Sequence, residues 1–314
     1  MRTNRPLLAA TVVLSFVLLA GCTELPGKAD HNLGSNLSGE GSFQQLGESI
    51  QQEVGKAAAT VEQAVEKTAV KVSDSITADW TSTELSASQA INSASTLTMV
   101  NPVGKIEVRP VTGEQLTVTA TVRLEKDSAH EADHQIIMDN AEVSIQLSGD
   151  RVNVSTHSKE NPGQDLWSWA QDELDDSDFT IDYAIGVPEG IDTFEITNNV
   201  GEIRLQDLKG VYHVTSNVGA IHISGAEVTG SSTVEANTGS IRLDLASMAE
   251  GSSLKAKTDV GSLTAILPES MGCDLETSSE LGAITGADSG TSKLNGGGPL
   301  LSLSSKIGSI TVHQ

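Results

Sequence analysis

The chain has 314 residues, with 19 Lys and Arg against 42 Asp and Glu, which gives a formal net charge of -23 and a pI near 4.5. Such an acidic surface repels phosphate groups, so nucleic acid is excluded as a partner and anionic lipid headgroups are unfavourable. The 2 cysteines, Cys22 and Cys273, exclude a disulfide framework.

Residues 1–21 have the pattern of a secretory signal peptide. Arg2 and Arg5 precede an apolar stretch that is too short for a comfortable membrane-spanning helix. The stretch ends in the sequence LAGC, which resembles a bacterial lipobox with Cys22 as its cysteine. We expect cleavage before Cys22 and attachment of lipid, palmitate included, to its thiol. The protein is then anchored to a membrane of the bacterial cell envelope, outside the cytoplasm; an ordinary signal with a chance cysteine is the alternative.

Residues 22–42, with four glycines, indicate a lipid anchor and a flexible tether. Residues 43–96 are expected to form a helical stalk and a linker. Between 43 and 76, apolar residues recur every eleven positions, in the columns Phe43, Val54, Val65, Ile76; Ile50, Val61, Val72; and Leu46, Ala57. This period gives a nearly straight stripe. An exposed stalk, self-association and a position on the membrane all stay open.

Residues 97–190 are less regular and indicate an opening rung, a cap and irregular strands. The opening rung, 97–108, contains Asn101-Pro102-Val103-Gly104. Strands are expected at 116–124, 143–147, 152–157 and 180–187, and a helix at 129–141. Because terminal repeats must cover an open sheet edge, we expect this half to cap the stack.

Residues 191–314 repeat one short phrase: a polar residue, a usually apolar one, Gly, a usually small residue, then Ile or Leu. The glycines are Gly201, Gly219, Gly239, Gly261, Gly282 and Gly308, and Gly104 occupies the same place in the opening rung. A spacing of about 21 residues is typical of stacked repeats. Each rung should be a strand, a glycine corner and a second strand. Stacking at about 4.8 Å then gives an all-β, single-stranded β-solenoid, or β-helix.

Alternation assigns each position of a rung to the inside or the outside. Residues two and four after the glycine, and five and seven before it, are expected to form inward columns. Asn199, Asn217 and Asn237, followed by Asp259, are expected to form a ladder along one edge. The outward column Arg204, His222, Arg242, Thr264, Thr285 and Thr311 has no pair of acids for glycan cleavage. We interpret it as a neutral or anion-attracting stripe.

The sequence His130-Glu131-Ala132-Asp133-His134 satisfies the zincin pattern, so a zinc metallopeptidase is an alternative. Catalytic zinc also needs a third ligand and a cleft, and no Gly-x-x-His continuation follows His134. We favour a solvated helix whose other face, Ala129, Ala132, Ile136 and Ile137, packs on the solenoid. The acidic run 172–178 lacks EF-hand spacing and is interpreted as a solvated loop. We expect no catalytic residue, no metal and no cofactor.

Trp167 and Trp169 are the candidate binding residues, since exposed indoles suit stacking or insertion. The alternative is that they close the open end of the solenoid. Cys273, which has no basic neighbour in the sequence, is expected to be a core thiol.

Taken together, residues 95–314 resemble a known family. The opening Asn-Pro-Val-Gly rung, the segment 181–190 with the sequence IDYAIGVPEG and the Gly-x-Ile rungs look like the "putative adhesin" β-solenoid family of bacterial envelope proteins. The resemblance implies a surface-displayed β-helix, in some members linked to envelope stress, with no established enzyme activity. We therefore expect a non-enzymatic lipoprotein that binds a cell-surface glycan or an envelope protein. Envelope-stress sensing is the alternative, and the oligomeric state stays open.

Overall fold

The computed structural model describes residues 80–126 and 130–314, and the predictions for residues 1–79 lie outside these ranges. The described residues form two helices and twenty strands. The helices are α2 (Glu131–Asn140) and α3 (Leu166–Leu174). The strands of the first half are β1 (Trp80–Ala90), β2 (Thr96–Val103), β3 (Ile106–Pro110), β4 (Gln115–Glu125), β5 (Ala141–Ser148), β6 (Arg151–Ser158) and β7 (Phe179–Val187). Neither helix is long and apolar enough to cross a membrane.

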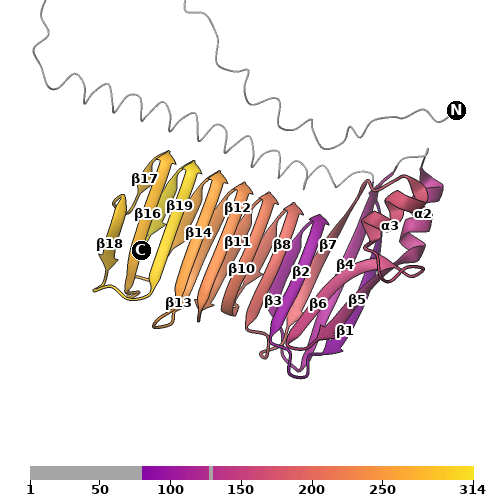
Figure 1. The fold of residues 1–314 in the computed structure, drawn as a ribbon, viewed down its shortest axis with the longest axis horizontal. Helices are drawn as coiled ribbons and strands as arrows, with labels where there is room; N and C mark the ends of the chain where they lie inside the picture. The colour runs from indigo at the N-terminus through magenta and orange to yellow at the C-terminus, as the bar shows by residue number, and fades with distance from the viewer. Residues whose placement is uncertain (1–79, 127–129) are drawn as a thin grey trace, which may run out of the picture. The chain divides into compact units, whose positions relative to one another are not determined.

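The second half consists of the regular rungs. Its strands are β8 (Thr193–Val200), β9 (Ile203–Gln206), β10 (Lys209–Val218), β11 (Ile221–Val228), β12 (Ser231–Thr238), β13 (Ile241–Met248), β14 (Ser253–Val260), β15 (Leu263–Ile266), β16 (Cys273–Leu281), β17 (Ile284–Thr285), β18 (Gly290–Leu294), β19 (Leu300–Ile307) and β20 (Ile310–His313). Each rung runs from a strand of one sheet, through a glycine corner, into a strand of the other. Figure 1 shows the rungs side by side.

Two layers result. Sheet A has the order β1-β4-β7-β3-β9-β11-β13-β15-β20-β17. Sheet B has the order β5-β6-β2-β8-β10-β12-β14-β19-β16-β18. The rungs pair in parallel, whereas β1, β4, β5 and β18 pair antiparallel at the two ends. The predicted stack of β-solenoid rungs is therefore correct for the centre of the structure. Because of the antiparallel strands at the two ends, the strand pairing as a whole is mixed.

The inward columns lie where the alternation places them. Five residues before the glycines, Ile196, Val214, Val234, Ala256, Leu303 and Thr277 are all buried, and the column seven before is buried as well. The columns after the glycine are buried through Val312, but Ile284 and Gly286 of the outermost rung are half-exposed and exposed. Apolar burial stabilises the fold by about 25 cal/mol per Å². The core is therefore continuous along the stack and thins at β17.

Each glycine corner rests on the corner of the neighbouring rung. Gly239 has a φ of 147°, and a Cβ on it would lie 1.9 Å from the carbonyl oxygen of Gly219. The same overlap recurs at Gly201, Gly219, Gly261, Gly308 and Gly282, with distances between 1.8 and 2.1 Å. No other residue type fits this site, because the backbone of the next rung occupies the place of the side chain. The predicted corner glycines are thus explained by close approach of the backbones.

The order of the rungs differs from the order of the sequence, which corrects the expected solenoid. β19 lies between β14 and β16, and β20 lies between β15 and β17. At the other end, β2 and β3 lie between the pair β6 and β7 and the pair β8 and β9. All rungs share one phrase, so its period determines that they stack but leaves their spatial order undetermined.

Two further expectations are corrected. Residues 80–90, assigned to the linker, form β1, which pairs with β4 over its whole length. The buried face of α2 consists of His134 and Ile137, whereas Ala132 and Ile136 are exposed. The strand was missed because β1 is mostly polar and only half-buried. The predicted helix face was wrong for two reasons. Ile136 and Ile137 are adjacent and equally apolar, so the sequence does not decide which one is buried, and His134 is buried together with Asp176.

A mostly buried column three residues before the glycines, polar at every rung except for Ala236, was not predicted. Thr258 Oγ1 donates to the Gly239 carbonyl at 2.9 Å, and Asn198 Nδ2 donates to the Gly104 carbonyl at 2.9 Å. Ser305 and Ser279 do the same to the next corners. Backbone carbonyls buried at a corner need a donor, since an unpaired one costs about 1–3 kcal/mol. These side chains therefore lock consecutive corners together.

We predict that Gly239→Ala destabilises the protein by more than about 3 kcal/mol, because the methyl group overlaps backbone as well as straining φ. Gly251→Ala is the matched control. Gly251 also has a positive φ, but a Cβ there meets nothing within 4 Å, so only about 1–2 kcal/mol of conformational cost is expected. Ser240→Thr, at a half-exposed position, should change little. Denaturant unfolding measures all three, and equal losses for the two glycine variants would contradict the corner contact.

Candidate binding surface

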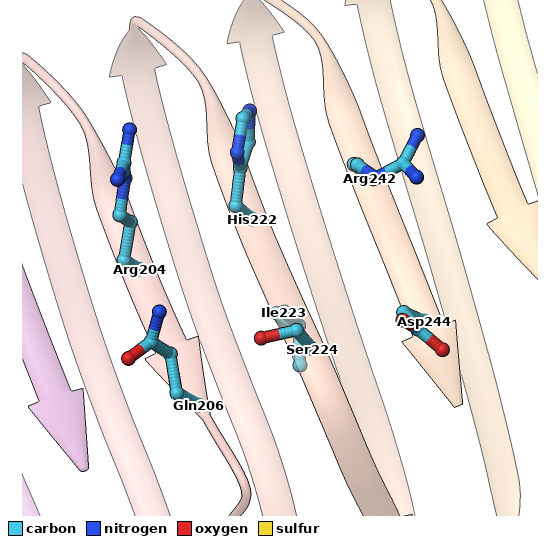
Figure 2. A pocket seen from close by; sticks show the side chains of 7 residues that line it. All are labelled: Arg204, Gln206, His222, Ile223, Ser224, Arg242 and Asp244. Atoms are coloured by element: carbon cyan, nitrogen blue, oxygen red, sulfur yellow. The ribbon is translucent and has the colours of Figure 1, made fainter. Parts of the chain in front are cut away.

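The outward face of sheet A carries a row of two arginines and a protonatable histidine. Arg204 on β9, His222 on β11 and Arg242 on β13 are register partners on adjacent parallel strands. Their neighbours along each strand, Ile203 and Leu205 on β9 for example, are buried in the core. Alternation of the strands therefore points all three polar side chains outward, one per rung (Figure 2). We call Arg204, His222 and Arg242 the cationic row.

A second row accompanies the first. Gln206, Ser224 and Asp244 lie two residues further along the same strands, as Figure 2 shows. Together the two rows surround a shallow hollow of about 190 Å³. A hollow of this size can accept one small polar group, such as a carboxylate, phosphate or sulfate, rather than a whole organic ligand.

Glu202 organises the row from the corner. Its Oε1 accepts a hydrogen bond from Nε of Arg204 at 2.6 Å and lies 3.7 Å from Nδ1 of His222. The hydrogen bond with Glu202 raises the pKa of Arg204 above its ordinary value. Most other rungs have Ala or Ser at the position of Glu202. An acidic residue in place of the usual small one was the sequence signal for this arrangement, and it was overlooked.

Arg242 completes the row without such a partner: within residues 80–126 and 130–314 no ion pair is seen for it. Its side chain is exposed, and its guanidinium can form paired hydrogen bonds with an oxyanion. The row continues as Thr264, Thr311 and Thr285, which are neutral. Within this outward column, the basic side chains are thus confined to three rungs, in a chain that is strongly acidic overall.

The outward face of sheet B has a different character. Its hollow, about 400 Å³, is lined mainly by Thr98, Thr197, Thr215, Thr233, Glu195 and His213. Hydroxyl groups at regular spacing form weak neutral hydrogen bonds, and Glu195 is already paired with Arg151 through a contact of 2.9 Å. The hollow is the larger one, but the cationic row has the more specific chemistry.

The predicted asparagine ladder is present. Asn217 Nδ2 donates to Asn199 Oδ1 at 2.9 Å, and Asn237 Nδ2 donates to Asn217 Oδ1 at 2.9 Å. The ladder ends at Asp259, which lies 2.9 Å from Lys306 and 3.4 Å from Lys257. Hydrogen bonding to Lys306, and secondarily to Lys257, lowers the pKa of Asp259. Because Lys306 belongs to the inserted rung, this ion pair joins segments that are distant in the sequence.

The tryptophans lie in the cap, on α3. Trp169 is buried, with 4% of its surface exposed. Trp167 is half-buried; its ring stacks on Phe179 at a centroid distance of 5.2 Å, and its Nε1 donates to the Phe179 carbonyl at 3.2 Å. Asp165 is the N-cap of α3, and its carboxylate accepts a hydrogen bond from the Ser168 amide at 3.0 Å. These contacts account for both indoles by packing, and a role in binding stays a prediction.

The zincin-like motif also lies in the cap. His134 Nε2 is 3.4 Å from Asp176 of the acidic loop, and both side chains are almost completely buried. The rings of His130 and His134 are 6.3 Å apart between centroids. Within the described ranges, no three His, Cys, Asp or Glu side chains gather closely enough to hold a metal ion. The His134–Asp176 contact, which joins α2 to the loop after α3, was missed because 42 residues separate the partners.

Cys273 is completely buried in β16, as expected for a core thiol. Burial, and to a smaller extent Asp274, raises the pKa of this thiol. A raised pKa leaves little thiolate at neutral pH, so the side chain is poorly suited to nucleophilic chemistry. Cys22, the predicted lipid site, lies outside the described residues.

Residues 190–293, which contain the corners from Gly201 to Gly282, match the family described as Toastrack DUF4097. The resemblance predicted from the Gly-x-Ile rungs is thereby confirmed. A search of curated proteins found no match.

Two solved structures are similar. One is a putative cell adhesion protein from Clostridium sporogenes, 14% identical, covering 74% of this chain and 100% of its own, with a TM-score of 0.42. The other is a putative adhesin from Bacteroides fragilis, 11% identical, covering 73% of this chain and 97% of its own, with a TM-score of 0.31.

We predict that Lys306→Met lowers the stability by less than about 1 kcal/mol at neutral pH, the usual range for an exposed ion pair. Since the folded pKa of Asp259 is lowered, the pair contributes above the unfolded value of about 3.9 and its contribution is lost as pH falls through the folded value. The difference between variant and wild type should therefore vanish in acid. Lys255→Met, on the same sheet face with no ion pair seen in the described part of the chain, is the control, and an acid-independent loss would contradict the assignment.

Proposed function

We propose that this chain, which carries a toastrack DUF4097 domain at residues 190–293, is a non-enzymatic, membrane-anchored envelope lipoprotein that binds an anionic ligand with its solenoid. The predicted signal peptide and its lipobox cysteine, Cys22, support a lipid anchor and a domain outside the cytoplasm. The adhesin-like fold supports a binding role, and the partner is a cell-surface glycan or an envelope protein.

The observation that carries the ligand class is the cationic row. Three cationic or protonatable side chains stand in register about 4.8 Å apart on a rigid parallel sheet. Groups held on regular strands keep their positions more accurately than groups on loops, and less entropy is lost when a ligand binds. A polymer that carries carboxylate or phosphate groups at similar intervals can contact several rungs at once, so weak contacts add up.

Catalysis is not needed to explain the row. Glu202 and His222 are close, but Glu202 is already engaged with Arg204, and the hollow is shallow and open to solvent. General acid–base chemistry requires a group within about 3 Å of a reacting atom in a site that excludes water. The arrangement suits recognition of charge better than turnover.

We predict that Arg204→Ala/Arg242→Ala weakens binding to polygalacturonate at least about ten-fold, because charge-assisted hydrogen bonds from both guanidinium groups are lost. Binding by the wild-type chain should weaken as salt rises, and neutral dextran should not bind. Thr264→Ala/Thr311→Ala, on the next two rungs of the same column, is the control. Titration calorimetry or biolayer interferometry gives the affinities, with thermal unfolding to verify folding.

Undiminished binding by the double arginine variant would remove the row from the binding site. If the purified chain bound no anionic polysaccharide, no cell surface and no envelope protein, the binding function itself would be wrong.

We further predict that Cys22→Ser releases the protein from the membrane. A single cysteine carries the lipid, and without acyl chains the acidic chain has little affinity for anionic lipid. Fractionation of cells and labelling with radioactive palmitate measure the effect. The parallel substitution Cys273→Ser should leave the label in place, and a Cys22→Ser protein that is still labelled would overturn the lipobox assignment.

A further inference from the structure

An apolar ridge runs along the glycine corners. It consists of the residues that directly precede the glycines, which are register partners from rung to rung. In spatial order the ridge is Val103, Val200, Val218, Thr238, Val260, Ile307 and Leu281. All seven are half-exposed or exposed, up to 39% at Val218, 40% at Ile307 and 52% at Leu281. An apolar column on the outside of a solenoid, interrupted here only by Thr238, indicates a contact surface.

The ridge has room on one side for a closely packed partner. The position after each glycine is occupied in the central and distal rungs by Ala220, Ser240, Ser262, Ser309 and Ala283. The glycines between have no side chains. The opposite side of the ridge carries the asparagine ladder. The ridge thus borders a smooth shelf of small residues, which suits the approach of a helix.

The chain enters the described structure at the same edge. Trp80, the first residue of β1, pairs with Glu125, and Leu124 pairs with Phe179 of β7. Phe179 lies two residues before Ile181, on whose carbonyl the Gly104 corner rests. β1 therefore runs from the corner edge to the opposite edge (Figure 1). The segment that precedes Trp80 leaves from the cap end of the ridge.

That segment, residues 50–76, lies outside the described residues, and its sequence predicts a helix with one narrow apolar stripe. The stripe is Ile50, Val54, Ala57, Val61, Val65, Val72 and Ile76. A helix of this length is about 40 Å long. From β1 to β17 sheet A has nine interstrand steps, about 43 Å. Except between Val65 and Val72, where one turn is skipped, the stripe has one residue per turn of about 5.4 Å, close to the 4.8 Å step of the ridge.

We propose that residues 50–76 form a helix that lies along the apolar ridge, running back from the cap toward Leu281. Counted from the junction at residue 77, about 24 Å of helix ends at Val61, and five interstrand steps, also about 24 Å, end at the corner after Val218. Val61 then meets Val218, and Val65 meets Val200. Contact between the stripe and the ridge then buries apolar side chains of both.

Attachment favours this occupant over others. A covalently linked segment whose end lies at the ridge has an effective concentration near the millimolar range, so a weakly hydrophobic stripe is sufficient. A second copy of the chain must bring another body with a strongly negative charge to the same edge. Residues 22–49 are then the spacer between the lipid at Cys22 and the solenoid.

Disulfide crosslinking tests the register. The chain from residue 22, with Cys22→Ser, receives Val61→Cys and Val218→Cys, and is oxidised with copper phenanthroline. We expect an intramolecular crosslink, seen as a monomer of altered mobility on a non-reducing gel. The control pair is Val61→Cys with His213→Cys, an exposed residue of the same strand that points away on the face of sheet B. Cys273 is buried and takes no part.

Limited trypsin digestion tests the contact without cysteines. In the docked state cleavage after Lys56, Lys67 and Lys71 should be slow, and Val218→Asp/Val260→Asp should accelerate it about ten-fold or more, because the open state becomes populated. Thermal unfolding shows whether the solenoid is still folded in this variant. Thr215→Asp/Lys257→Asp, on the same strands but on the open face of sheet B, should leave cleavage slow.

Crosslinks that join two chains would assign the ridge to a second copy and overturn the proposal. It would also be overturned by rapid cleavage in the wild-type chain, or by protection that appears only after addition of lipid vesicles.

Discussion

The contact on which the rest depends is the stacking of one glycine corner on the carbonyl of the next. With less than 2.2 Å between a Cβ on these glycines and the neighbouring oxygen, the corners can approach only because no side chain is present. This approach brings both strands of each rung into register with the next. At four of the corners a hydroxyl or amide donor three residues before the next glycine also bonds to the same carbonyl, so steric fit and hydrogen bonding act together there.

Register at the corner also creates the surfaces. Because every rung begins its second strand at the same point, the outward positions line up as rows, among them the cationic row, the asparagine ladder and the apolar ridge. A single substitution within the repeated phrase then changes the chemistry of one row while the backbone stays the same. Glu202 in place of a small residue is one such change, and it holds Arg204 and His222. The stacked-rung framework is thus suited to presenting rows of groups to a repetitive partner.

The sequence was sufficient for the corners, the inward columns and the ladder, since each depends on period and residue type alone. It was not sufficient for the order of the rungs, because Gly261, Gly282 and Gly308 occur in equivalent phrases and only their pairing partners distinguish them. The buried polar column was missed because alternation marks Asn198 or Thr258 as inward without indicating a carbonyl to bind. The cationic row was visible as a column, but its anchoring by Glu202 depends on side-chain geometry that spacing does not specify.

The insertion of β19 between β14 and β16 has a consequence for biogenesis. During synthesis β16 emerges before β19, at a time when the exposed edge of β14 offers it an equivalent corner. Pairing there would give a shorter stack that excludes β19 and β20 and leaves their apolar residues uncovered. The chain must therefore delay or reverse that pairing. The last strands to emerge, β19 and β20, then insert between the rung of β14 and β15 and the rung of β16 and β17. Folding that begins only when the whole chain is available avoids this choice, because β19 then competes for the edge of β14 from the start.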